Sequence, residues 1–250
     1  MPLRAIVFDL FDTLVDLRFE DLPHIEHEGR RLPASALRLH AAIAESAEVE
    51  FADYVAAEVA VHEALGAPRY KQGRELPTEE RFAAVLERLG VAEPGLPLRL
   101  TEIHMGVLHA AVSVPAHHEA LLAQLRSRVA LGLCSNFTHS GTAHRVLEEA
   151  GLQGHLDAVV VSDAVGWRKP RPEIFEAVLA ELGVARDEVL HVGDNLRADV
   201  GGAGALGLRT AWVTRRVRDP EQRLEQHEGA APDFVVRDLT ELAELADRLG

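Results

Sequence analysis

The sequence predicts an α/β protein in which a doubly wound parallel sheet is interrupted by an inserted α-helical domain. From about residue 121 onward, short β-type runs alternate with helical patterns, as expected of parallel strands joined by helices that cover both faces of the sheet. The segment 17–115 instead contains helix-compatible stretches and no convincing strand. We therefore expect a core domain of residues 1–16 and 116–250 and a helical cap-like domain of residues 17–115.

The individual elements follow from apolar runs and helical periodicity, taken in chain order. A first strand is expected at residues 5–9, and the insert offers helical stretches at 33–47, 48–65, 78–89 and 99–112. The later strands are expected at 128–136, 156–163, 187–194, 209–214 and 233–238. Helices are expected between and after them, at 140–152, 171–184, 197–208 and 239–249. Gly151 and Gly183 stand at helix ends, where glycine is common.

Composition excludes several classes of protein. The formal net charge of −14 repels a phosphate backbone, so we expect no nucleic-acid partner. The single cysteine, Cys134, rules out an intrachain disulfide and fits a reducing, cytoplasmic setting. The N-terminus lacks signal-peptide features and no run is long enough to span a membrane, so no membrane partner is expected. As a separate expectation, the protein is a monomer or a homodimer.

The basic residues are divided very unevenly between lysine and arginine. Of the 26 lysine and arginine residues, only Lys71 and Lys169 are lysines, and the other 24 are arginines. An ammonium is a compact point charge on a flexible stem, whereas a guanidinium is a planar fork. The rare lysine at position 169 therefore marks a place where an ammonium is needed.

Polar side chains follow the expected strands at the points where each strand ends. Open parallel sheets bind ligands at the carboxyl ends of their strands, so these side chains are expected around one crevice. They are Asp9 and Asp12 after the first strand, Ser135 and Asn136 after the second, Lys169 in the loop after the third, and Asp194 and Asp199 after the fourth.

These residues match, motif for motif, the haloacid dehalogenase (HAD) superfamily of hydrolases, which the chain resembles at both ends. The resemblance covers Asp9 in "VFDLFDTL", Ser135, Lys169 in "RKPRPEIF", and the acids of "VGDNLRAD". It implies a Rossmann-like core with a helical cap inserted between the first and second motifs. It also implies that Asp9 is a covalent nucleophile.

The resemblance further implies a Mg²⁺-dependent phosphatase of small phosphorylated metabolites that works through an aspartyl phosphate. Mg²⁺ prefers one or two carboxylates together with water and phosphate oxygens. The expected ligands are Asp9, the backbone carbonyl of Phe11, and Asp194, with Asp199 binding through water or orienting the others. Ser135, the Asn136 backbone amide and Lys169 are expected to hold the phosphoryl group, and Lys169 to bridge it to the nucleophile.

One position departs from the phosphatase pattern. The residue two past the nucleophile is usually a second Asp that protonates the leaving oxygen, and here it is Phe11. The 2-haloacid dehalogenases carry an aromatic residue there, so a dehalogenase-like hydrolase is an alternative. Against it, those enzymes lack the acid found here as Asp194, and have Tyr where this chain has Phe175. A catalytically degenerate HAD-fold binding protein is the other alternative.

Several of these residues also have plain structural interpretations. Asp12 is expected to cap a turn rather than to take part in catalysis, and Ser135 or Asn136 could cap the helix at 140–152. The G-x-G-x-x-G match at 202–207 does not directly follow a strand, so we assign it to packing within a helix. The neighbouring histidines, such as His117 and His118, fit no recognised zinc spacing.

Overall fold

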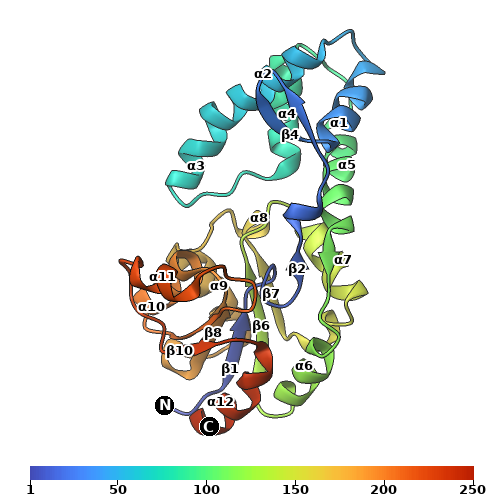
Figure 1. Ribbon diagram of the computed structural model, residues 1–250. Helices are drawn as coiled ribbons and strands as arrows, with labels where there is room; N and C mark the ends of the chain where they lie inside the picture. The colour runs from blue at the N-terminus through green and yellow to red at the C-terminus, as the bar shows by residue number, and fades with distance from the viewer. The chain divides into compact units, whose positions relative to one another are not determined.

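The computed structural model describes residues 1–250, and the chain divides into two compact units (Figure 1). The core unit comprises Met1–Asp16 and Ser113–Gly250, and the helical unit comprises Leu17–Val112. The boundaries expected from the sequence were 16/17 and 115/116. Each unit is described by itself.

The core unit is built on a six-stranded sheet whose order is β10-β9-β8-β1-β6-β7. All neighbouring strands in it run parallel, which confirms the predicted doubly wound sheet. After β1 the chain forms β6 and then β7 on one side of β1. It then crosses to the other side of β1 and forms β8, β9 and β10 in that order. The strands are β1 (Ala5–Phe8), β6 (Ala130–Ser135), β7 (Ala158–Val161), β8 (Val189–Gly193), β9 (Arg209–Val213) and β10 (Phe234–Val236).

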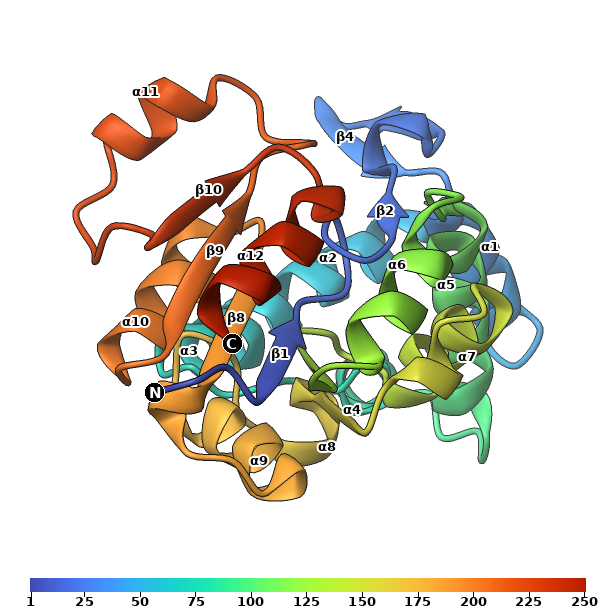
Figure 2. The ribbon, with the colours of Figure 1, turned by 90° about the horizontal axis from the view of Figure 1, so that it is seen from below.

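Helices cover both faces of this sheet. Helices α9 and α10 lie on one side of it, and α6 and α12 lie on the other (Figure 2). The helices of the core unit are α6 (His118–Arg126), α7 (Ser140–Glu149), α8 (Ser162–Val165), α9 (Pro172–Leu182), α10 (Gly202–Ala205), α11 (Pro220–Glu225) and α12 (Leu242–Leu249). Shorter turns are η3 (Gln153–His155), η4 (Arg186–Glu188), η5 (Leu196–Gly201) and η6 (Leu239–Glu241).

Apolar burial explains why β1 is the central strand. All four of its residues are fully buried, and Ala5 and Val7 belong to a cluster with side chains of α9 such as Phe175 and Val178. At about 25 cal/mol per Å² of apolar surface, such burial is the main stabilising contribution to folding. The first strand therefore holds its carboxyl end rigidly at the middle of the sheet.

The segment expected as one helix at 197–208 is divided. Its first part, η5, is a π-helical turn, and α10 is a single α-helical turn. A Cβ atom on Gly202 would lie 2.8 Å from the Cα of Pro170 and 2.9 Å from the ring of Phe175. This close approach confirms that the G-x-G-x-x-G match serves packing.

The helical unit contains the predicted helices and also strands that were not predicted. Its helices are α1 (Ser35–Ala44), α2 (Phe51–Val61), α3 (Ala67–Lys71), α4 (Thr78–Arg88) and α5 (Leu96–Ala110), with the turns η1 (Phe19–Asp21) and η2 (His62–Gly66). An antiparallel hairpin joins β3 (His24–His27) to β4 (Arg30–Pro33). The prediction that residues 17–115 contain no strand was therefore wrong. A second two-stranded sheet pairs β2 (Asp16–Leu17) with β5 (Val112–Ser113).

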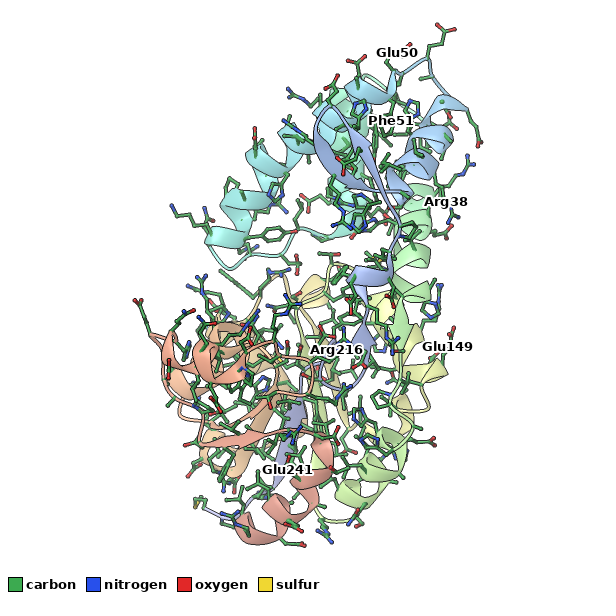
Figure 3. All side chains as sticks on the ribbon, viewed as in Figure 1. Arg38, Glu50, Phe51, Glu149, Arg216 and Glu241 are labelled. Carbon is green, nitrogen blue, oxygen red and sulfur yellow. The ribbon has the colours of Figure 1, made fainter.

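The helical unit has its own hydrophobic core, formed mainly by α1, α2, α4 and α5. Phe51, labelled in Figure 3, lies at its margin with its ring centroid 4.9 Å from that of His27 and 5.3 Å from that of His40. None of the helices in either unit is long and apolar enough to cross a membrane.

Candidate active site

The carboxyl ends of β1 and β8 meet where the direction of winding reverses, which is where open parallel sheets bind ligands. The two strands pair side by side, with Phe8 opposite Val192, and the Asp9 amide donates to the carbonyl of Val192 at 2.9 Å. Asp9 follows β1 directly, and Asp194 follows β8 directly. The fold therefore brings these two predicted site residues to one edge of the sheet.

Lys169 is buried between two of the predicted acids. Its Nζ atom lies 2.6 Å from Oδ1 of Asp9 and 2.7 Å from Oδ1 of Asp199, and its side chain is only 2% exposed. It also donates to the carbonyl of Cys134 at 2.6 Å. Desolvating such charges is costly, and a well-packed apolar replacement often stabilises a protein as much or more. The buried ammonium is therefore better explained by chemistry than by stability.

Charge pairing outweighs burial for Lys169 and Asp199. Burial alone would lower the pKa of the Lys169 ammonium, but the charges of Asp199 and Asp9 raise it above its usual range. Burial alone would raise the pKa of Asp199, but Lys169 and a hydrogen bond from His191 hold it well below its usual range. Both groups are therefore charged at neutral pH.

For Asp9 and Asp194, burial outweighs the attraction of Lys169, and the pKa of each carboxyl group is raised. Burial raises the pKa of Asp9 to about 6, although Lys169 opposes the shift. Burial and repulsion from Asp9 and Asp199 raise the pKa of Asp194 to about 8. Ligand-capable oxygens of all three acids lie within 4.8 Å of one another. This edge of the sheet thus gathers more negative charge than Lys169 neutralises.

The donor set fits a hard divalent cation. Carboxylate oxygens are the side-chain ligands that Mg²⁺ prefers. Asp199 has both oxygens engaged, since Oδ1 faces Lys169 and His191 and Oδ2 accepts the Asn195 amide at 3.0 Å. Asp194 makes no side-chain hydrogen bond or ion pair, and its backbone is fixed by the Trp212 indole, which donates to its carbonyl at 2.7 Å. Asp9 and Asp194 are therefore the acids able to hold a cation directly.

Ser135 ends β6 and is only 1% exposed, yet its hydroxyl has no hydrogen-bond partner. A buried polar atom without a partner costs about 1–3 kcal/mol, so such atoms are rare in folded proteins. The alternative that Ser135 or Asn136 caps the following helix was wrong, because His139 is the N-cap of α7 and accepts from the Thr142 amide. The Ser135 hydroxyl is thus available to an oxygen of a ligand.

Asn136 has a role that the sequence did not indicate. Its Nδ2 donates to the Lys169 carbonyl at 3.0 Å, and its Oδ1 accepts from the Lys169 amide at 2.7 Å. The side chain thereby clamps the backbone of Lys169 at two points. It holds the ammonium in place rather than offering its own side chain to a ligand.

His191 was also missed by the sequence analysis. It is buried in β8, and its Nε2 donates to Oδ1 of Asp199 at 3.0 Å. A histidine inside the otherwise apolar run of β8 was the available signal. Its hydrogen bond fixes the Asp199 carboxylate that faces Lys169.

The loop after β1 carries Phe11, which replaces the usual second aspartate, and Asp12, which was expected to cap a turn. Phe11 packs its ring 4.8 Å from that of Phe137, so an apolar pair stands beside the carboxyl ends of β1 and β6. Asp12 adopts a left-handed conformation, with φ of 59°. Its carboxylate accepts from Nε of Arg216 at 2.7 Å, a residue labelled in Figure 3. The fold thus directs Asp12 toward the loop after β9.

Comparison with known proteins gives a consistent assignment. A family model for haloacid dehalogenase-like hydrolases matches residues 3–207. A phosphoserine phosphatase from Thermus thermophilus is 34% identical over 96% of this chain and 98% of that protein. The pyrimidine 5'-nucleotidase YjjG of Escherichia coli is 34% identical over 66% of this chain and 69% of that protein.

Solved structures share the fold at lower sequence identity. A 2-haloacid dehalogenase from Pseudomonas syringae matches with a TM-score of 0.70 and 19% identity, covering 99% of this chain and all of that one. The HAD-hydrolase YfnB from Bacillus subtilis matches with a TM-score of 0.61 and 22% identity over 99% of this chain and all of that one. With a family model covering most of its length and a relative aligned nearly end to end, the chain belongs to the haloacid dehalogenase-like hydrolases.

Proposed function

We propose that this hydrolase is a Mg²⁺-dependent phosphatase of small phosphorylated metabolites that acts through an aspartyl phosphate on Asp9. The observation that carries the proposal is the buried Lys169 ammonium between Asp9 and Asp199. The names of the relatives support a phosphorylated substrate, since the relative aligned nearly end to end is a phosphoserine phosphatase. A reducing, cytoplasmic location is part of this proposal and fits the free, buried Cys134.

The reaction proceeds in two displacements. A carboxylate oxygen of Asp9 bonds to phosphorus while the bond from phosphorus to the leaving oxygen breaks, and that oxygen departs with the electron pair. Water then attacks the phosphorus of the aspartyl phosphate and releases inorganic phosphate and free Asp9. Lys169 and the Ser135 hydroxyl hold the phosphoryl oxygens during both steps, where charge develops.

Mg²⁺ would be held by Asp9 and Asp194, with the Phe11 carbonyl as a further ligand. When bound, it supplies positive charge that lets a carboxylate approach a phosphate dianion. Asp199 does not serve as a direct ligand in this scheme, because both of its oxygens already have partners. It positions Lys169 and, through the Asn195 amide, the loop that carries Asp194.

Phe11 determines which leaving groups the site can handle. A second aspartate at this position would donate a proton to the leaving oxygen, a contribution of about 10²- to 10⁴-fold. With a phenyl ring there, substrates whose leaving group is already acidic are favoured, such as aryl and acyl phosphates. Simple alkyl phosphates are expected to react slowly.

A second candidate function is hydrolysis of 2-haloacids, and one observation favours it. The Phe11–Phe137 pair forms an apolar surface beside the nucleophile, and a halide leaving group needs no proton. Asp194 weighs against it, because its carboxyl group is a side-chain ligand for a cation, and displacement of a halide by Asp9 needs no cation on the leaving group.

The discriminating experiment is a screen of phosphorylated metabolites and 2-haloacids, each with added Mg²⁺ and with EDTA. We expect phosphate release that depends on Mg²⁺ and that is lost in Asp9→Asn. Halide release that ignores EDTA would favour the second candidate. The absence of any turnover, with a retained fluoride–metal complex at Asp9, would identify a binding protein on this fold.

The substitution Phe11→Asp tests the role of the missing acid. We expect kcat/KM for alkyl phosphates to rise at least ~10-fold, because a carboxyl group can now protonate the leaving oxygen. Phe11→Asn is the matched control, since it has the same shape and no proton to give. If alkyl and aryl phosphates react equally fast in the wild type, or if Phe11→Asp changes neither rate, another group already donates the proton.

A further inference from the structure

A second group of ligand-capable side chains lies in the core unit, apart from the carboxylates of the candidate active site. His117 is the N-cap of α6, His118 is the first residue of that helix, and Asp238 is the N-cap of η6. Ligand atoms of the three residues lie within 4.8 Å of one another. The sequence offered only the neighbouring histidines, and the packing of α6 against η6 adds the carboxylate.

The hydrogen bond made by His118 determines which of its nitrogens is free. Its Nδ1 lies 2.8 Å from the carbonyl oxygen of Leu14, and a carbonyl can only accept, so Nδ1 carries the proton. In the neutral ring Nε2 then carries a lone pair. His118 is fully buried, and Nε2 has no hydrogen-bond partner. A histidine that binds a metal usually donates its other N–H to a carboxylate or backbone carbonyl in this way.

The other two ligands are already paired and remain accessible. Nε2 of His117 lies 2.8 Å from Oδ1 of Asp238, and their side chains are 46% and 24% exposed. Tetrahedral ligands about 2.1 Å from a metal are ~3.4 Å apart, so a small rotation of the His117 ring would admit an ion. Arg215 lies 3.6 Å from the other oxygen, Oδ2, and its main ion pair is with Asp16.

We propose that His117, His118 and Asp238 form a binding site for a transition-metal ion of the Zn²⁺ class, with water completing the coordination. Two imidazole nitrogens and one carboxylate suit Zn²⁺, Co²⁺ or Ni²⁺, whereas Mg²⁺ prefers oxygen ligands alone. The site is therefore chemically distinct from the acids around Asp9. Through the Leu14 carbonyl and Asp238, a bound ion ties the loop after β1 to α6 and η6, and so stabilises the core unit.

The test is calorimetric titration of EDTA-stripped protein with Zn²⁺ in excess Mg²⁺, carried out on the wild type and on Asp194→Asn. Asp194→Asn weakens the carboxylate cluster but leaves the histidines intact. We expect one equivalent of Zn²⁺ to bind in both proteins and to raise the melting temperature. Replacing Zn²⁺ with Co²⁺ should give the visible absorption of a nitrogen-ligated cobalt ion.

The variants His117→Ala and Asp238→Asn should each weaken Zn²⁺ binding at least ~10-fold, consistent with the loss of one ligand. His117 is half exposed, so its removal should leave the fold intact. His155→Ala, in the same unit, is the matched control and should bind like the wild type. Zn²⁺ binding that vanishes in Asp194→Asn, or that persists unchanged in His117→Ala, would overturn the proposal.

Discussion

The two units bury different kinds of side chain. The core unit buries Lys169, Asp199 and His191 in one hydrogen-bonded network at the edge of its sheet. The helical unit keeps its arginine–carboxylate pairs at the surface, as in Arg69–Glu80 and Arg99–Glu45, where such pairs stabilise little. Apart from Glu75 of the helical unit, which is 3% exposed, the most deeply buried charges gather around Lys169, beside the proposed nucleophile Asp9.

The helical unit has polar groups of its own around a cavity of about 190 Å³. Leu39, Val55 and Val59 line much of it, and Tyr54, which donates to Glu58 at 3.0 Å, and His104 lie at the same cavity. Burial and the charge of Arg81 lower the pKa of His104 to about 3. The Lys169–Asp199 pair of the core unit is therefore buried in its charged form, whereas His104 of the helical unit is buried as a neutral imidazole.

The largest effect should come from removing the ammonium at the centre of the core network. In Lys169→Met we expect kcat to fall ~10²- to 10³-fold, because a cation facing the developing charge is lost. The free energy of unfolding should fall by about 3–5 kcal/mol, since Asp9 and Asp199 lose their buried partner. Steady-state kinetics and chemical denaturation measure the two effects.

Lys71→Met is the matched control, because it removes the other lysine, which is exposed at the end of α3. Its kinetics should be unchanged and its stability within about 0.5 kcal/mol of the wild type. If Lys71→Met and Lys169→Met lowered kcat and stability equally, the burial of Lys169 in the core unit would have no special importance for activity or folding.

A smaller effect is expected at Ser135, where activity and stability should separate. Ser135→Ala should lower kcat/KM by ~10- to 10²-fold, the value of a hydrogen bond to a charged oxygen. Its stability should be unchanged or higher, because the buried hydroxyl has no partner to lose. Ser162→Ala is the contrasting variant, since that hydroxyl bonds to the amide and carbonyl of Phe137, and it should lose about 1–3 kcal/mol. A destabilised Ser135→Ala would show that the hydroxyl serves folding.

The smallest effect is a pH dependence in the helical unit. Because the pKa of folded His104 is about 3, the unfolded chain binds a proton between about pH 6.5 and pH 3 that the folded chain does not. Stability should therefore fall as the pH is lowered through this range, by about 1–3 kcal/mol between pH 7 and pH 4. Denaturation of His104→Phe should lack this loss, with His62→Phe as the surface control. An identical pH profile in all three proteins would contradict a buried neutral imidazole.

The parallel sheet could be predicted from the sequence because each strand is an apolar run bounded by turns and helices. The hairpin β3–β4 could not, because its residues alternate only between exposed and half-buried positions and are mostly polar. Its turn residues, Glu28 and Gly29, both have positive φ, but Glu-Gly is a weaker signal than Asn-Gly. Hydrophobic patterning cannot identify a strand that buries little.

The location of the candidate site was predictable for a topological reason, and its hydrogen bonds were not. Residues that end parallel strands must share one edge, so Asp9 and Asp194 could be grouped from their order alone, and Lys169 could be added from the loop after the third predicted strand. The sequence assigned a role only to the backbone amide of Asn136, because spacing does not determine that its side chain is directed at the backbone of Lys169. The hydrogen bond from His191 to Asp199 could not be predicted either, because the position of Asp199 depends on the π-helical turn η5.

The scarcity of lysine, combined with the burial of one of the two, makes the protein easy to label selectively. Amine-reactive dyes attack exposed, unprotonated amines, and the Lys169 ammonium is both enclosed and held in its protonated form. Of the two lysines, such a dye should therefore modify Lys71, which is exposed in the helical unit, and leave Lys169 unmodified. Lys71 therefore offers a single lysine attachment point for a fluorophore on the helical unit without any engineered cysteine.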